Sequence, residues 1–308
     1  MPETEAVELS IILTSRNPSA QLKRSLDRVL KAQRPRQEVI VSFCRQSDGY
    51  PVDWPLNYPG VTFIKSPVDT DLPMMLSEAI GRARGEIIAI TDSGSIVAED
   101  WCESILKAHT LTDAPVVGGT VEPERLTGLA SWAAFFCDYA QFMLPAERHC
   151  IKAVPGNNIS IKRRALRSGT EFVEDEFWKS LWCRHLRSEG VELVMEPAIS
   201  VVSENRYRLL PLLLQRFRQA RAFAGFSSRN DSFWRRSVYA ARSLLLPPLF
   251  TVRVTSAVIR KRRSLGMLIL SWPIIALIAI FWSAGETVGY AAGRLGNARK
   301  SSETMVSI

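Results

Sequence analysis

The sequence is poor in the residues from which disulfide frameworks and zinc sites are built. Its 308 residues include five cysteines and three histidines. The cysteines show no CxxC spacing and have no histidine at the spacing of a metal site, which argues against both kinds of site. Their odd number and irregular intervals argue for a reducing compartment. We expect all five to be small buried hydrophobic residues rather than catalytic thiols: Cys44, Cys102, Cys137, Cys150 and Cys183.

The sequence also lacks an apolar stretch at its N-terminus, and it has few acidic residues between positions 203 and 264. The first ten residues, MPETEAVELS, lack the apolar stretch of a signal peptide, so none is expected. In residues 203–264, fourteen lysines and arginines stand against Glu204 and Asp231, a balance of +12, while the whole chain carries +8. This basic segment would meet anionic lipid headgroups. A nucleic-acid surface is the less favoured alternative, with Phe217 and Trp234 among the arginines.

Charged residues are absent from residues 264–285, a run of 22 positions. About 20 apolar residues suffice to cross a bilayer core. Basic residues 260–263 precede the run, and Trp282 and Tyr290 lie near its far end, as interfacial anchors do. We therefore predict a transmembrane helix over residues 265–290 in the cell inner membrane, a polar tail over 291–308, and a cytoplasmic location for the bulk of the chain. Residues 226–264 form the basic interfacial segment, because their apolar run SLLLPPLFTV is too short to span.

Apolar strand-like runs and amphipathic helices alternate in the first half of the chain. Strands are predicted at residues 9–15, 38–44, 61–66 and 85–92, with helices after the first and third. This alternation predicts an α/β fold with parallel pairing and helices on both faces of the sheet. Ligands of such sheets bind beyond the carboxyl ends of the strands. Residues 14–17, 44–48 and 92–95 should therefore surround one crevice.

The second half is less regular. It contains strand-like segments at residues 115–123, 191–197 and 198–204, and helices at 127–143, 174–189 and 207–225. The helix at 174–189 should end at Gly190.

Four segments, in this order, resemble a family-2 glycosyltransferase of the GT-A type. They are LSIILTSRNP, GEIIAITDSGSIVAEDW, VPGNNISIKRRAL and EFWKSLWCRHLRSEGVELVMEPAISVV. The likeness covers about residues 8–225, and the WSAGETVGYAAG segment is similar to the membrane tails of some members. It implies a GT-A-like (Rossmann-like) mixed sheet flanked by helices as one domain over residues 1–225, followed by a C-terminal membrane helix region.

The resemblance also implies a chemistry and a set of site residues. In that family a DXD motif holds Mg²⁺ or Mn²⁺ against the diphosphate of a nucleotide-sugar donor, and an acidic residue deprotonates the acceptor hydroxyl. Carried over position by position, the metal ligand would be Asp92. The donor-binding residues would be Ser15, Asn17, Asp92, Gly94, Arg216 and Arg221, and the acceptor-side residues would be Gly156, Asn157 and Asn158.

The sequence departs from the family pattern at several of these positions. The second Asp of DXD falls on Gly94, and the catalytic acid falls on Lys179. The aspartate that ends the second strand is missing, since Asp48 in SDGY is better read as a turn former. Asp175 and Glu176 are the candidate catalytic acids that would act from one turn earlier. Alternatively, these acids only favour a helix dipole, and Asp175 pairs with Lys179 at helical spacing.

Three functions fit the sequence. The first is a membrane-associated glycosyltransferase that uses a nucleotide-sugar donor and a lipid-linked or polysaccharide acceptor. Arg216 and Arg221 would then help to neutralise the diphosphate, or would contact lipid headgroups. The second is a non-catalytic relative that serves as a membrane-bound partner or regulator of another transferase. The third, least favoured, is a basic membrane or nucleic-acid adaptor, and no nucleic-acid partner is expected.

Overall fold

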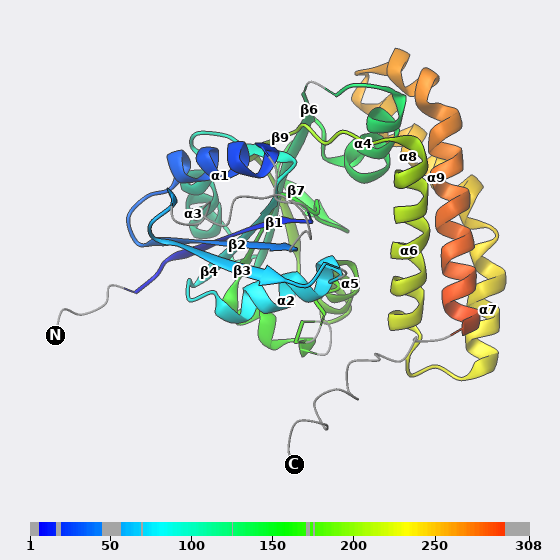
Figure 1. The fold of residues 1–308 in the computed structure, drawn as a ribbon, viewed down its shortest axis with the longest axis horizontal. Helices are drawn as coiled ribbons and strands as arrows, with labels where there is room; N and C mark the ends of the chain where they lie inside the picture. The colour runs from blue at the N-terminus through cyan, green and yellow to red at the C-terminus, as the bar shows by residue number, and fades with distance from the viewer. Residues whose placement is uncertain are drawn as a thin grey trace. The chain divides into compact units, whose positions relative to one another are not determined.

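The computed structural model describes residues 6–16, 20–44, 57–68, 70–124, 126–170, 173–174 and 176–292. The chain divides into two compact units (Figure 1). The first comprises Met1–Leu126 and Asp138–Asn205, and the second comprises Thr127–Cys137 and Arg206–Ile308. The domain boundary expected after residue 225 falls inside a helix of the second unit.

Four parallel strands form the N-terminal half of the sheet in the first unit. Strand β1 (Leu9–Ser15) pairs with β2 (Gln37–Cys44) on one side and with β4 (Ile87–Asp92) on the other, and β3 (Val61–Ser66) pairs with β2. Every residue of β1 is buried. Because both faces of β1, β2 and β4 are largely covered, these strands are nearly continuous apolar runs in the sequence, whereas the edge strand β3 exposes Thr62 and Lys65. All four strands were predicted correctly.

The other half of the sheet introduces antiparallel pairing. Within the described residues the strand order is β3-β2-β1-β4-β8-β6-β9-β5, with β7 beside β9. Strand β8 (Ile159–Lys162) lies antiparallel between β4 and β6 (Val116–Pro123). Strand β9 (Leu193–Ser203) is continuous, whereas the sequence predicted two strands there, and it pairs with the short β5 (Ser95–Val97) and β7 (His149–Ile151). The predicted mixed sheet is confirmed.

Helices cover both faces of the sheet. Figure 1 shows α1 (Ala20–Ala32) and α3 (Trp101–Leu111) on one face, and α2 (Leu72–Arg82) and α5 (Lys179–Ser188) on the other. The prediction that the last of these helices begins at Glu174 is wrong. Helix α5 begins at Lys179, because the preceding segment bonds elsewhere: the amide of Phe177 donates to the carbonyl of Pro73 at 2.8 Å.

Three of the five cysteines are buried, as expected, namely Cys44, Cys102 and Cys183. Burial raises the pKa of Cys102 to about 12 and that of Cys183 to about 11. Such thiols stay protonated at neutral pH and are poor nucleophiles. Cys137 is half-buried and Cys150 is exposed, so for these two the expectation of burial does not hold.

The second unit is helical. It contains most of α4 (Leu129–Tyr139), then α6 (Leu209–Ser227), α7 (Phe233–Ser243), α8 (Leu246–Lys261) and α9 (Leu265–Ala292). Within the described residues, α9 is the one helix that is long and apolar enough to cross a membrane by itself, with a mean hydropathy of 2.3. Helices α7 and α8 meet the same criteria only as a pair, bent by 53° where they join. The apolar run with two prolines, residues 243–252, therefore starts at this bend and continues through the first turns of α8.

Helices α6 and α9 pack with their backbones in direct contact. A Cβ atom on Gly285 would overlap the carbonyl oxygen of Phe217 and would lie 2.9 Å from the Cβ of Ala220. One turn later, a Cβ on Gly289 would lie 2.7 Å from the Cβ of Ala224. Small residues four positions apart on both helices thus allow this approach, as in small-xxx-small helix pairs of membranes.

A buried polar cluster joins α7 to α9. The carboxylate of Glu286 accepts hydrogen bonds from Trp282 Nε1 at 2.8 Å and from Ser243 Oγ at 3.3 Å, and Ser283 Oγ donates to the carbonyl of Ser243 at 2.6 Å. Near the end of α9, the guanidinium of Arg236 donates to the carbonyl of Tyr290 at 2.8 Å. The carboxylate of Glu286 in α9 therefore has hydrogen-bond partners within the second unit.

Candidate functional site

The carboxyl ends of the parallel strands meet at one edge of the sheet, as predicted. In the β1–β4 register Thr14 lies beside Asp92, and in the β1–β2 register Ser15 lies beside Phe43. Ser15 and Asp92 are therefore neighbours at the crevice expected for a ligand. Two other predicted positions at this edge, Asn17 and Asp48, lie outside the described residues.

The Asp92 carboxylate is held by the turn that follows β4. Its Oδ1 accepts a hydrogen bond from the amide of Gly94 at 3.0 Å and one from Ser95 Oγ at 2.6 Å. Burial raises the pKa of Asp92, and these two hydrogen bonds oppose the increase. Oδ2 makes no hydrogen bond within the part of the chain that the structure describes, so this oxygen remains available to a ligand.

The predicted acceptor-side residues have different environments. Gly156 is exposed, whereas Asn157 is 1% exposed and its Nδ2 donates to Ser95 Oγ at 2.7 Å. The Oδ1 of Asn157 has no hydrogen-bond partner among the described residues. Asn157 and Ser95 thus link this segment to Asp92 through a chain of hydrogen bonds.

Asn158 is fully buried and bonds only to the protein core. Its Nδ2 donates to the carbonyls of Thr120 at 2.8 Å and Ile199 at 3.0 Å, and its Oδ1 accepts from Trp101 Nε1 at 2.9 Å. These bonds connect α3, β6 and β9. The arrangement gives Asn158 a structural role behind the site, although the resemblance places it on the acceptor side.

The residues around Asp92 do not fit a divalent cation. Gly94 stands where the family has its second carboxylate, and a Cβ atom there would overlap the side-chain carboxamide of Asn205. No group of three or more His, Cys, Asp or Glu side chains in the described ranges could hold a metal ion. A divalent cation needs several oxygen ligands, preferably charged, and the two carboxylates near this site in the described residues, Asp92 and Asp138, do not form such a group.

Lys179, which the resemblance aligns with the family's catalytic acid, lies close to Gly156. A Cβ atom on Gly156 would lie 3.2 Å from Lys179 Nζ, so the ammonium lies over the exposed backbone of Gly156. Burial lowers the pKa of Lys179 to about 8, while the charges of Cys183, Asp138 and Asp92 oppose the shift. Asp138 and Asn205 carry no sequence signal of their own. Each lies far along the chain from Asp92, and only the fold brings it to the site.

The remaining candidate residues are less closely tied to Asp92. The Oε2 of Glu176 accepts a hydrogen bond from Trp178 Nε1 at 2.6 Å, so this carboxylate is already engaged. Asp175 lies outside the described residues. Helix α5 begins at Lys179, so the predicted pairing of Asp175 with Lys179 stays a prediction. Arg216 and Arg221 belong to α6 of the second unit, and a role in donor binding stays a prediction for both.

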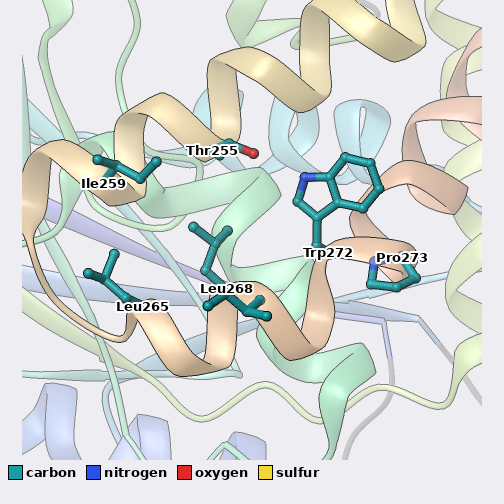
Figure 2. Close-up of a pocket in the computed structure, with 7 residues that line it drawn as sticks. Thr255, Ile259, Leu265, Leu268, Trp272 and Pro273 are labelled. Carbon is teal, nitrogen blue, oxygen red and sulfur yellow. The ribbon is translucent and has the colours of Figure 1, made fainter.

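The second unit contains an apolar groove of about 630 Å³ between α8 and α9. Figure 2 shows Thr255 and Ile259 on one helix and Leu265, Leu268 and Trp272 on the next. Ile269 and Pro273 complete the lining. The basic residues 260–263 lie in the last turn of α8 and in the short connection to α9. An apolar groove beside a cationic loop is a surface of the kind that membrane interfaces accommodate.

Comparison with known proteins agrees with the geometry. The model of glycosyl transferase family 2 matches residues 10–148, which include β1, β4 and Asp92. A mannosyltransferase from Pyrobaculum calidifontis, PcManGT, solved with GDP-Man and Mn²⁺, is 16% identical; the match covers 94% of this chain and 87% of that one, with a TM-score of 0.51. GalNAc-T7, solved with UDP, GalNAc and Mn²⁺, is 12% identical over 67% of this chain, with a TM-score of 0.50.

These structural matches establish the fold alone, because their sequence identities are low. This chain spans 45% of the length of GalNAc-T7. No curated protein matches the sequence. The resemblance to the family is nevertheless confirmed over the first two of the four sequence segments: residues 10–148 match glycosyl transferase family 2, within a chain that has a GT-A-like fold and a long apolar C-terminal helix.

Proposed function

We propose that the protein is a membrane-associated glycosyltransferase that transfers a sugar from a nucleotide-sugar donor to a lipid-linked or polysaccharide acceptor. The observation that supports this best is the Asp92 turn. Within the matched region, a carboxylate with an available oxygen ends a buried strand at the ligand edge, and Ser95 and Asn157 fix its orientation. Ser15 and the exposed Gly156 complete the side facing the donor and the acceptor.

Transfer requires stabilisation of the departing diphosphate and removal of the acceptor proton. The described residues offer a cation, Lys179, for the first task. For the second we propose Asp175 or Glu176, which precede Lys179 by four and three residues in the sequence, with Glu176 exchanging its hydrogen bond from Trp178 Nε1 for one from the acceptor hydroxyl. Each of these steps is one that this chain's own side chains can perform.

The membrane association in this proposal rests on α9, on the groove between α8 and α9, and on the basic charge of residues 203–264. We expect α9 to lie in the inner membrane and the first unit to lie on the cytoplasmic side. Washing membranes with high salt or alkaline carbonate should therefore leave the full-length protein in the pellet, because an apolar span is not held by charge. Release into the supernatant by either wash, detected by immunoblot, would contradict the span.

A second candidate function follows from Gly94 and Lys179. Both replace acids of the family pattern, so the protein could keep the donor site and lack turnover. It would then act as a membrane-bound partner or regulator of another transferase. The two functions share a nucleotide site and differ in whether the bound donor reacts.

The deciding experiment is a donor panel on the full-length protein in detergent. Calorimetric titration with UDP-, GDP- and dTDP-sugars should identify one nucleotide that binds with a Kd between about 1 μM and 1 mM, the usual range for such substrates. Asp92→Asn should weaken that binding, and the exposed Asp113→Asn serves as its control. Release of free nucleotide over time then supports the enzyme, and binding without release supports the regulator. If no donor binds, both functions are rejected.

A further inference from the structure

Lys179 lies at the N-terminal end of α5, where a positive charge is unfavourable for the helix. It is the first residue of α5, and a cation at a helix N-terminus opposes the helix dipole. Helix stability therefore does not explain this side chain. An anion bound at the same place would instead be favoured by both the lysine and the helix end.

The Lys179 ammonium also has unused hydrogen-bonding capacity. Its Nζ forms no hydrogen bond and no ion pair within 4.0 Å among the described residues, although Asp92 and Asp138 influence it electrostatically. An ammonium carries three donors, and a partly buried one is stabilised when they are used. The exposed Gly156 has no side chain to cover Nζ, so a ligand can reach the ammonium from that side.

The same region is closed to a divalent cation. The carboxamide of Asn205 fills the space that a side chain at position 94 would need, so no second carboxylate fits there, and a cation bound at Asp92 would be repelled by the nearby ammonium. At neutral pH a lysine with a pKa of about 8 is about nine-tenths protonated, so this repulsion persists. The ammonium of Lys179 is therefore the positive charge that the described residues place at this site, beside the carboxylates of Asp92 and Asp138.

We infer that Lys179 binds the diphosphate of a nucleoside diphosphate through its ammonium group, so that this site takes its ligand without a divalent cation. This inference rests on the proposed donor site, and it names Lys179 as the group that binds the negative charge of the diphosphate. Asp92 remains free to accept hydrogen bonds from hydroxyl groups of the ligand, since Oδ2 is not needed for a metal. Asn205 fills the space that a side chain at position 94 would need.

The test measures binding of UDP, GDP and dTDP to the full-length protein by calorimetry, in EDTA and in Mn²⁺. We expect the Kd of the preferred nucleotide to change less than about threefold between the two conditions. Lys179→Met should raise that Kd about tenfold or more, because a desolvated charge-assisted hydrogen bond is lost. Lys179→Arg should recover most of the affinity, since it keeps the charge. The exposed Lys107→Met is the matched control and should bind as the wild type does.

Three results would overturn the inference, and they are distinguishable. If EDTA abolishes wild-type binding, a cation holds the diphosphate and the inference fails while the proposed function stands. If Lys179→Met binds as tightly as the wild type, the lysine does not contact the ligand. If the wild type binds none of the nucleotides, the proposed function fails as well. A thermal melt of each variant checks folding, and Lys179→Gln replaces Lys179→Met if the latter does not fold.

Discussion

Replacing Asn158 by alanine is expected to lower the free energy of unfolding of the first unit by about 3 kcal/mol or more. The change removes three hydrogen bonds and leaves Trp101 Nε1 and the carbonyls of Thr120 and Ile199 without their partner. A buried polar group without a partner costs about 1–3 kcal/mol. Urea unfolding of the full-length protein in detergent, followed by tryptophan fluorescence, measures the effect.

The exposed Asn57→Ala is the matched control for this substitution and should stay within about 0.5 kcal/mol of the wild type. The experiment also separates the structural role from the one that the family resemblance implies. If Asn158→Ala unfolds at the wild-type urea concentration but its KM for the acceptor rises, Asn158 contacts the acceptor and the structural role is wrong.

Replacing Gly285 by leucine is expected to separate α6 from α9 and to destabilise the second unit by about 3 kcal/mol or more. The added side chain would collide with the backbone of Phe217, which cannot yield as a flexible side chain can. Inserting atoms into a packed contact typically costs about 1–3 kcal/mol, and a clash with backbone lies at the upper end or beyond. A thermal melt in detergent, followed by circular dichroism at a helix wavelength, reports the loss.

Gly266→Leu gives the matched control, since both glycines lie in α9 and a Cβ on Gly266 meets nothing within 4 Å. Its melting temperature should stay near that of the wild type. Equal melting temperatures for the Gly285 and Gly266 variants would show that α6 and α9 are not in backbone contact in solution.

Much of the first unit could be predicted because its strands are buried on both faces. Such strands appear as apolar runs with polar ends, and 9–15 and 85–92 were read this way. The start of α5 was misread for a local reason: the acids at 174–176 favour a helix N-terminus, but Phe177 bonds to the start of α2 instead. The split assigned to β9 has a similar origin, since Pro197 interrupts the sequence pattern while the strand continues.

The site could be predicted only where its residues follow one another along a strand and its turn. Asp92 and the substitution at Gly94 were visible because they stand in a recognisable motif. Asn205, which fills the space beside Gly94, and Asp138, which influences Lys179, come from distant segments and have no pattern of their own. For Asn158 the motif was visible but its burial was not, because burial depends on α3 and β9 packing around it.

The carboxylate of Glu286 makes the order in which the helices are synthesised important for the proposed membrane span. An acidic side chain in an otherwise apolar helix hinders entry into a bilayer unless its polar atoms find partners. Here one partner, Trp282, is in the same helix and the other, Ser243, is in α7. Ribosomal synthesis runs from the N-terminus, so α7 has already emerged when α9 arrives. In the proposed membrane span, this order of helices makes Ser243 available to Glu286 before α9 enters the bilayer, and moving α7 behind α9 would leave the acid to insert with one partner missing.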